Sequence, residues 1–577
     1  MNFTECPQSI EAEATGGKIL LDKLFQSGVK YIFAIPGRES EAILFNESPE
    51  LKVILTSIEL TAGFAAYAHA IVSGKTQVVF STLGPGAANL ANAIYSACAD
   101  RVPVVFIAAQ VERSKCFYNN THQCVDTVEM YKSVSKYALE INGAEELPSA
   151  IEKAFQITQV EPKGPAVISI PIDVLKQKIK ISDSLSKTNC ILLSGSYPVI
   201  PENSKIDHSE IGKVISILKA ANQPLVYIGN EVIRSGSVNL IRRLCTTYDI
   251  PMISAYDSKG VLPSDSKLNY FAYTNYASGI LGFDIEQILF EPVDCVLAFG
   301  YDLKDDVFPA KHFSRGRDKT LINFSSYRMP EEIASQFLHI QGNLYESLDL
   351  LLEKMNTEDF DFNQPYDISP LKKVISIKQK NIESPKGYVN VISVINAINE
   401  AAAVLVSDVG TFRHYSVLFG NTDNPNFFLT SAGSSSFGTG LPIGLGACLA
   451  HPSETKVIVL TGDGGFNSIV GDLRTLKMLD LNIVIIVLNN NENGLIGIYQ
   501  QKGHKIVYPP AYSHSEVSFV RVAQGYACKA FKVSSGETLS YRISEAFEKK
   551  KGPTVIEVPV YYSEEDVYNL TNINYLA

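Results

Sequence analysis

The segment KVIVLTGDGGFNSIVGDLRTLKMLDLNIVIIVLNNNENG (456–494) decides the fold of this 577-residue chain. It opens with an apolar run typical of a buried strand and reaches the turn GDGG (462–465). An amphipathic stretch from about Ser468 predicts a helix, and a second apolar run ends at NN (489–490). A strand, a crossover helix and a second strand predict a parallel α/β sheet.

The ends of these two strands predict a binding site. Parallel strands present their carboxyl ends at one edge of a sheet, so Asp463 and Asn490 are expected to converge there. One carboxylate and one amide oxygen suit Mg²⁺, while Gly464 and Gly465 allow a diphosphate to approach the backbone at a helix N-terminus. The alternative is a plain Asp-Gly turn before an Asn-rich loop. The spacing of 27 positions across an intact βαβ unit favours the site.

The same alternation of strands and helices continues outward along the chain. It predicts an α/β protein with three consecutive doubly wound parallel-sheet domains, at 1–182, 206–355 and 371–577. Polar stretches rich in Ser, Asn and Pro (182–206 and 355–370) separate them. Helices are expected at 59–73 and 87–99. The expected strands lie at 31–37, 76–86, 102–110, 166–175, 223–229, 250–256, 294–300, 320–324, 403–410, 456–465 and 482–490.

Composition narrows the class of function. Lys plus Arg number 50 against 61 acidic residues, a net charge of −11, which disfavours a nucleic-acid binder. The nine cysteines form no CxxC pair, and this dispersal is typical of reduced core thiols in the cytoplasm. An acidic, polar start and the lack of an apolar run of about 18 residues argue against a signal peptide and a membrane partner. Small-molecule substrates are the expected partners.

The GDG turn, the helix and the NN pair resemble the thiamin diphosphate (ThDP) motif, and the whole chain resembles the acetolactate-synthase-like ThDP enzymes. This resemblance implies ThDP and Mg²⁺ as cofactors, with Asp463, Asn490 and the backbone carbonyl of Glu492 as metal ligands. It also implies a pyrimidine-binding, a middle and a diphosphate-binding domain. Family members place the cofactor between two subunits, so a homodimer or homotetramer is implied.

Further cofactor-binding residues follow from the resemblance. Glu59 lies in a stretch similar to the family's HE-x-x-A-x-x-A segment, which implies that it protonates the aminopyrimidine ring and so promotes the nucleophilic ylide. An acid in a first helical turn also has a purely structural explanation, and Ile58 replaces the usual His. LGPGAAN (83–89) resembles the family's GPGATN turn. The other implied cofactor-binding residues are Gly410, Thr411, Phe412, Ser435, Phe437, Gly462, Asp463, Gly464, Gly465 and Asn490.

Two stretches point to the chemistry. NNTHQCVD (119–126) and TFRHY (411–415) depart from pyruvate-using acetolactate synthases and resemble the N2-(2-carboxyethyl)arginine synthases. The resemblance implies a transferase that takes glyceraldehyde-3-phosphate, eliminates water and phosphate to leave an acryloyl unit on ThDP, and adds an amino-acid amine. Arg413 would hold the phosphate, and His122 and His414 would shuttle protons. Gln123, Tyr276 and Tyr562 would bind the reacting unit.

The residues are also consistent with other functions. An acetolactate-synthase-type carboligase that uses pyruvate is the nearest alternative. A ThDP-binding scaffold without activity is disfavoured by Glu59, Asp463 and Asn490, and a dinucleotide-dependent dehydrogenase by the lack of a GxGxxG turn after a first strand. The sequence does not decide the acceptor amine or whether the middle domain binds FAD.

Overall fold

The computed structural model divides the chain into two compact units, Met1–Val199 and Ile200–Ala577. The structure describes residues 13–40, 51–118, 120–180, 208–272, 280–281, 289–304, 319–358, 360, 362, 372–373, 375–377, 384–494, 496–497, 500, 513, 515–549 and 552–562.

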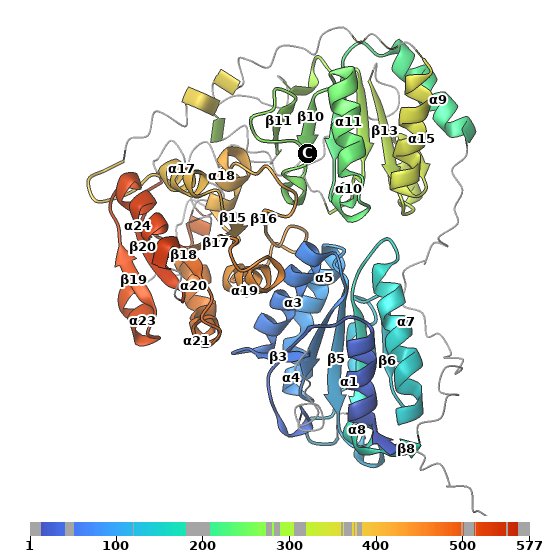
Figure 1. Cartoon of the computed structure of the whole chain (residues 1–577), viewed down its shortest axis with the longest axis vertical. Helices are drawn as coiled ribbons and strands as arrows, with labels where there is room; N and C mark the ends of the chain where they lie inside the picture. Colours follow the sequence, from blue (N-terminus) through green and yellow to red (C-terminus); the bar gives the residue numbers. More distant parts are fainter. Residues whose placement is uncertain are drawn as a thin grey trace, which may run out of the picture. The chain divides into compact units, whose positions relative to one another are not determined.

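The first unit contains a six-stranded parallel sheet in the order β3-β2-β4-β5-β7-β6 (Figure 1). Its strands are β2 (Tyr31–Ala34), β3 (Lys52–Leu55), β4 (Gln77–Ser81), β5 (Val104–Gln110), β6 (Tyr137–Glu140) and β7 (Ala166–Pro171). Its helices are α1 (Gly16–Gln26), α3 (Glu59–Ser73), α4 (Pro85–Asn89), α5 (Ala91–Ala99), α6 (Thr127–Tyr131), α7 (Leu147–Gln159) and α8 (Ile172–Lys176). A small antiparallel pair of β1 (Glu13–Thr15) and β8 (Lys178–Lys180) closes the unit.

The second unit begins with a sheet in the order β11-β10-β9-β12-β13-β14, which is also parallel throughout. Its strands are β9 (Pro224–Ile228), β10 (Met252–Ser254), β11 (Asn269–Ala272), β12 (Cys295–Phe299), β13 (Thr320–Ser325) and β14 (Leu338–Gln341). Its helices are α9 (His208–Ala220), α10 (Glu231–Arg234), α11 (Val238–Tyr248), α14 (Glu331–Ala334) and α15 (Leu344–Asn356).

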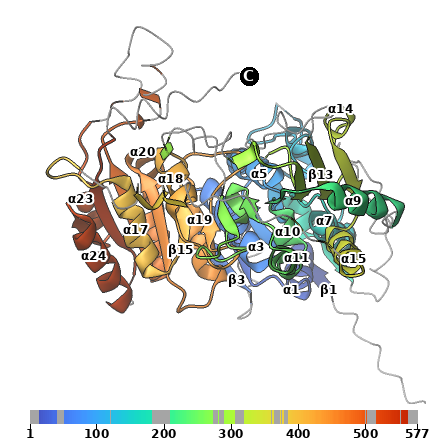
Figure 2. The same ribbon diagram turned by 90° about the horizontal axis from the view of Figure 1, so that it is seen from above.

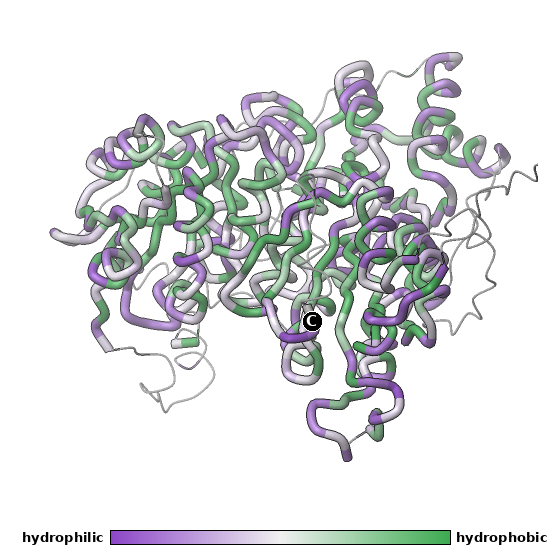
Figure 3. Tube along the Cα trace, turned by 60° about the horizontal axis from the view of Figure 1, so that its bottom comes forward, coloured by the Kyte–Doolittle hydropathy of each residue, from purple (hydrophilic) through white to green (hydrophobic). Residues whose placement is uncertain are grey.

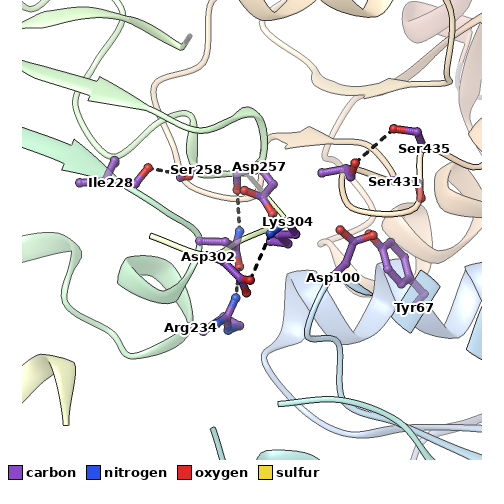
Figure 4. Close-up of polar contacts among 12 residues, drawn as sticks. Tyr67, Asp100, Ile228, Arg234, Asp257, Ser258, Asp302, Lys304, Ser431 and Ser435 are labelled. Atoms are coloured by element: carbon purple, nitrogen blue, oxygen red, sulfur yellow. Dashed lines mark hydrogen bonds and ion pairs between the residues drawn. The ribbon is translucent and has the colours of Figure 1, made fainter. Parts of the chain in front are cut away.

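Loops at the carboxyl edge of this middle sheet are joined by polar contacts. The buried Lys304 forms an ion pair with Asp257, and Asn230 donates a hydrogen bond of 2.6 Å to the carbonyl oxygen of Asp257. Figure 4 shows Asp257 and Lys304 facing each other. These contacts connect the loops that follow β9, β10 and β12.

The third sheet has the order β16-β15-β17-β18-β20-β19 and is parallel. Numbered along the chain, its strands follow the order 2-1-3-4-6-5, as those of the first sheet do. Its strands are β15 (Val404–Ser407), β16 (Phe428–Leu429), β17 (Val457–Gly462), β18 (Ile483–Asn489), β19 (Lys529–Lys532) and β20 (Thr554–Pro559). Its helices are α17 (Val391–Ala401), α18 (Thr411–Phe419), α19 (Gly440–Ala450), α20 (Asp463–Ile469), α21 (Leu473–Met478), α23 (Phe519–Gly525) and α24 (Gly536–Lys549).

Helices cover both faces of this third sheet. Successive side chains of a strand point to opposite faces. Ile458 and Leu460 of β17 belong to the hydrophobic cluster that contains α17 and α24, which lie side by side in Figure 2. Val459, between them, contacts α19, where a Cβ on Gly444 would lie 2.5 Å from Cγ2 of Val459. The apolar strands therefore run as continuous hydrophobic stretches, visible in Figure 3, as expected of a sheet buried on both faces.

The middle and third sheets share one unit because a single hydrophobic cluster extends from β9 and β12 to α17, α18 and the third sheet. Lys259, after β10, reinforces this packing. Its Nζ donates hydrogen bonds of 2.6 and 2.8 Å to the carbonyl oxygens of Val417 and Gly420, at the end of α18.

The three parallel α/β sheets confirm the predicted fold class. Three details differ. The helix expected from about Ser468 begins at Asp463, because the last three residues of GDGG already adopt helical backbone geometry. The helix expected at 87–99 is interrupted at Leu90. Nine strands were not predicted: β1 and β8 of the small antiparallel pair, and β3, β6, β11, β14, β16, β19 and β20 of the three sheets.

None of the helices that the structure describes combines the length and apolar character needed to cross a membrane.

Candidate active site

A cavity of about 390 Å³ opens at the carboxyl edge of the third sheet. From β15 the chain proceeds outward to β16, whereas β17 and the strands after it lie on the other side, so the strand order reverses between β15 and β17. Open α/β sheets bind ligands at such a reversal. The cavity is lined by Val409, Gly410, Thr411, Phe412, Phe437, Gly462, Asp463, Gly464, Gly465, Leu488, Asn490, Glu492, Asn493, Gly494, Ile496, Val560 and Tyr562.

Asp463 lies in the wall of this cavity as the first residue of α20 and is 5% exposed. Its Oδ1 accepts a hydrogen bond of 2.7 Å from the N–H of Gly464, and its Oδ2 accepts one of 3.2 Å from the N–H of Glu492. The second bond ties the loop after β18 to the turn after β17. A carboxylate oxygen accepts more than one bond, so both oxygens keep capacity for a cation.

Asn490 and Glu492 reach the cavity from the loop after β18. Gly494 allows this loop to fold closely, since a Cβ there would lie 3.2 Å from Nδ2 of Asn490. Among the described residues, no three His, Cys, Asp or Glu side chains form a metal-binding cluster. The cavity wall offers a cation one carboxylate, one amide oxygen and backbone oxygens, a donor set that suits Mg²⁺.

Two glycines allow tight packing where β17 passes into α20. A Cβ on Gly465 would lie 2.6 Å from Oδ2 of Asp408 and 2.9 Å from Oγ1 of Thr461. A Cβ on Gly462 would lie 3.3 Å from the ring of Phe412. Glycine at these positions therefore lets the backbone pack tightly against Asp408, Thr461 and Phe412, and Gly462 and Gly465 both line the cavity, where a backbone without side chains suits a diphosphate.

Asp408 is a structural residue of the site that the sequence reasoning did not single out. It follows β15 and is fully buried. Its Oδ1 accepts bonds from the N–H groups of Val409, Gly438 and Thr439, and its Oδ2 accepts one of 2.9 Å from the hydroxyl of Thr461. Burial raises the pKa of Asp408, although these hydrogen bonds act in the opposite direction. An acid directly after the apolar run AVLV (403–406) and Ser407 was the available signal.

Helix α18 carries Arg413 and His414 beside the cavity residue Phe412. The guanidinium of Arg413 donates bonds of 3.1 Å to the carbonyl oxygen of Ser431 and of 3.2 Å to the hydroxyl of Ser435. It also lies 5.4 Å from the ring centre of Tyr256. Arg413 is only 8% exposed, and no ion pair to a carboxylate is recorded for it among the described residues. It is a buried cation held by neutral groups.

His414 contacts the middle domain and not the cavity wall. Its Nδ1 lies 3.0 Å from the hydroxyl of Tyr256. Burial, followed by the charge of Arg413, lowers the pKa of His414 well below its usual value, so the ring is neutral near pH 7. The expected proton shuttle at His414 would therefore start from the neutral ring. A neutral His414 still accepts or donates one hydrogen bond.

Most of the remaining predicted residues of the second unit line the cavity, whereas Ser435 lies beside Arg413. Phe437 and Tyr562 line the cavity with Gly410 and Thr411, and Phe437 is 49% exposed. Ser435 adopts a left-handed backbone with φ of +48° and contacts Arg413. Tyr276 lies outside the described residues.

In the first unit, Glu59 begins α3 and is 7% exposed. Its Oε2 accepts a hydrogen bond of 3.0 Å from Nδ2 of Asn89, and a Cβ on Gly86 would lie 3.1 Å from its Oε1. The LGPGAAN turn therefore packs against this carboxylate. A Cβ on Gly84 would lie 2.8 Å from the Cβ of Gln123, so the same turn also contacts the loop that carries Gln123 and the exposed His122.

Comparisons with known proteins agree with this geometry. Residues 14–130 match the N-terminal TPP binding domain of thiamine pyrophosphate enzymes, residues 211–351 the central domain and residues 408–558 the C-terminal TPP binding domain. The mitochondrial acetolactate synthase of Schizosaccharomyces pombe is 27% identical over 95% of this chain and 84% of its own length. The acetolactate synthase of Bacillus subtilis is 26% identical over 95% of this chain and 94% of its own length.

Fold, cavity and domain matches together define a thiamin-diphosphate-dependent enzyme. Within this class, the chain belongs to the acetolactate-synthase-like family.

Proposed function

We propose that the protein is a carboligase of the acetolactate synthase type, which decarboxylates pyruvate and joins the two-carbon unit to a second 2-oxo acid. The cavity at the reversal of the third sheet, with Asp463 and Asn490 in its wall, is the observation that carries this proposal. The names of the relatives support the substrate. The earlier preference for a carboxyethylarginine-synthase-type reaction has less support, because both relatives described above are acetolactate synthases.

The residues present fit ThDP and Mg²⁺. Asp463, Asn490 and a backbone oxygen of Glu492 would hold the cation, and the glycines from Gly462 to Gly465 would receive the diphosphate. When bound, the cofactor supplies a nucleophilic carbon that adds to a carbonyl group. Glu59 would hold the proton exchanged with the aminopyrimidine ring, and Asn89 orients its carboxylate. We also propose a homodimer or homotetramer, which sedimentation of the full chain would test.

Arg413 favours a second candidate, the carboxyethylarginine-synthase-type reaction. A guanidinium that is 8% exposed and has only neutral recorded partners is suited to receive an anionic substrate group. Its planar fork binds a phosphate with two parallel hydrogen bonds. The substrates would be a phosphorylated three-carbon aldehyde and an amino acid such as arginine.

One experiment separates the two candidates. The purified protein is incubated with ThDP and Mg²⁺, either with pyruvate alone or with glyceraldehyde-3-phosphate and arginine. Acetolactate from pyruvate without phosphate release supports the first candidate. Phosphate release with an N-carboxyethyl arginine product supports the second and overturns the first. No turnover in either arm contradicts both.

A further inference from the structure

Two cysteines in the loop between β5 and α6 lie in direct contact. The sulfur atoms of Cys116 and Cys124 are 2.7 Å apart, closer than non-bonded sulfur atoms normally approach and approaching the S–S bond length of about 2.05 Å. Sequence reasoning treated all nine cysteines as dispersed thiols. The other cysteines that the structure describes are Cys98, Cys245, Cys295, Cys448 and Cys528.

The loop itself holds the two sulfur atoms together. The hydroxyl of Thr121 donates a bond of 2.8 Å to the carbonyl oxygen of Lys115 and accepts one of 3.2 Å from the N–H of Phe117. The N–H of Cys124 donates a bond of 3.1 Å to the carbonyl oxygen of Thr121. The chain therefore turns back on itself through Thr121, which brings Cys124 onto Cys116.

The same loop carries two of the predicted site residues. Gln123 adopts a left-handed backbone with φ of +59° and packs on Gly84. Two residues further along the loop, the carbonyl oxygen of Val125 accepts a hydrogen bond of 2.7 Å from Nε2 of Gln110. A covalent link from Cys116 to Cys124 would enclose His122 and Gln123 in a closed ring and restrict both residues.

We propose that Cys116 and Cys124 form a reversible disulfide that fixes this loop. The oxidant is a low-molecular-weight disulfide, R–S–S–R. The more exposed Cys116 attacks one sulfur and releases R–SH, and Cys124 then attacks the Cys116 sulfur of the mixed disulfide and releases the second R–SH. The two thiols lose two protons and two electrons, and the reagent gains them. A dithiol reverses the reaction.

The environment of the thiols determines the rate of this oxidation. Burial, with the neighbouring Cys124, raises the pKa of Cys116 to about 12. Because the thiolate is the attacking species, oxidation is expected to be slow at pH 7 and faster at pH 9. Because Cys116 stays protonated at pH 7, no thiolate stabilises the reduced form of the pair.

Mass spectrometry of the full-length protein tests the proposal. Residues 116–132 contain both cysteines and no Lys or Arg before Lys132, so trypsin releases the pair in one peptide. After treatment with oxidised glutathione and alkylation of the remaining thiols, we expect this peptide without alkyl groups and lighter by two hydrogen atoms. Dithiothreitol should restore the doubly alkylated form. A wild-type peptide that stays doubly alkylated, or carries only glutathione, overturns the proposal.

Three variants and one further measurement complete the test. Cys116→Ser and Cys124→Ser should each end as a mixed disulfide with glutathione or as a single alkylated thiol. Cys98→Ser is the matched control, since Cys98 and Cys124 are both 7% exposed, and it should leave the linkage unchanged.

Amide hydrogen exchange of residues 117–124 should slow by roughly tenfold on oxidation of the wild type. Equal exchange in both forms would overturn the fixing of the loop. Neither readout depends on the proposed function.

Discussion

At the scale of single residues, each proposed role depends on how a polar group is buried and partnered. Glu59 and Asp463 are nearly buried carboxylates that accept hydrogen bonds from neutral donors, Asn89 in one case and backbone N–H groups in the other. Arg413 is a buried cation with neutral partners. Groups in this state cost stability and are suited to ligand binding.

Glu59→Gln should lower turnover by at least about 100-fold while the free energy of unfolding changes little, because the amide keeps the shape but cannot exchange the proton. Steady-state kinetics and urea unfolding check both parts. The control is Glu129→Gln, whose side chain is 61% exposed in a surface ion pair with Lys132 and should be silent in both measurements. Near-normal turnover of the Glu59 variant would remove this residue from the mechanism.

Arg413→Met should raise KM for the anionic substrate by roughly 10- to 100-fold, since a hydrogen bond to a charged group contributes about 1.5–3 kcal/mol. Folding should persist, because an apolar side chain of similar length replaces a buried charge. The KM of whichever substrate supports turnover is measured for wild type, Arg413→Met and Arg413→Lys. An unchanged KM in both variants would exclude contact between Arg413 and the substrate.

At the scale of elements, the site depends on close packing of α18, α19 and α20 around the carboxyl ends of β15 and β17. Asp408 links the end of β15 to the turn before α19 and to Thr461 of β17. Lys259 of the middle domain binds the carbonyl groups at the end of α18. Changes at these contacts should alter the cavity without touching a ligand.

Gly465→Ala should weaken ThDP binding by at least about tenfold and lower the free energy of unfolding by about 1–3 kcal/mol, because its Cβ would lie 2.6 Å from Oδ2 of Asp408. Calorimetric titration and urea unfolding provide the measurements. Gly212→Ala in α9 is the matched control. No atom lies within 4 Å of its Cβ, so helix propensity alone should stabilise it by about 0.5–1 kcal/mol. Wild-type binding in Gly465→Ala would contradict the tight turn.

The buried Lys259 predicts a pH dependence of stability. Burial lowers the pKa of Lys259 to about 7, whereas an unfolded lysine titrates near about 10.4. Between these two pH values the unfolded chain binds more protons than the folded protein. The free energy of unfolding therefore rises with pH, by up to about 1.4 kcal/mol per pH unit from Lys259. This contribution is lost as the pH falls towards 7. Urea unfolding at pH 7, 8 and 9 should show a smaller rise in Lys259→Met. Parallel pH curves for the two proteins would refute this assignment.

At the scale of the whole molecule, much of the architecture could be predicted from the sequence. The three parallel-sheet domains follow from apolar runs such as KVIVLTG that alternate with helices, and helix α3 has the predicted bounds Glu59–Ser73. The missed strands are short, mostly at the sheet edges, or mixed with polar residues, as in β3 and β19, so local pattern gives little signal.

The candidate site was predictable only in part. Asp463, Asn490 and the glycines follow directly from strand ends, and the structure places them in one cavity wall. The rest of the site depends on tertiary structure. The contacts of Asp408 and the Tyr256–His414 contact join segments distant in sequence, and the Cys116–Cys124 contact depends on the path of one loop. Tyr256 and His414 are 158 positions apart, beyond any periodicity argument.

Calorimetric titration of ThDP into the full-length protein, with and without Mg²⁺, tests the central claim most directly. The account predicts binding that requires Mg²⁺ and weakens by at least about 100-fold in Asp463→Ala, a loss of about 2.7 kcal/mol. Asp480→Asn, an exposed acid before β18, should bind like the wild type. Binding of equal affinity without Mg²⁺, or in the Asp463 variant, would contradict the proposed cofactor site.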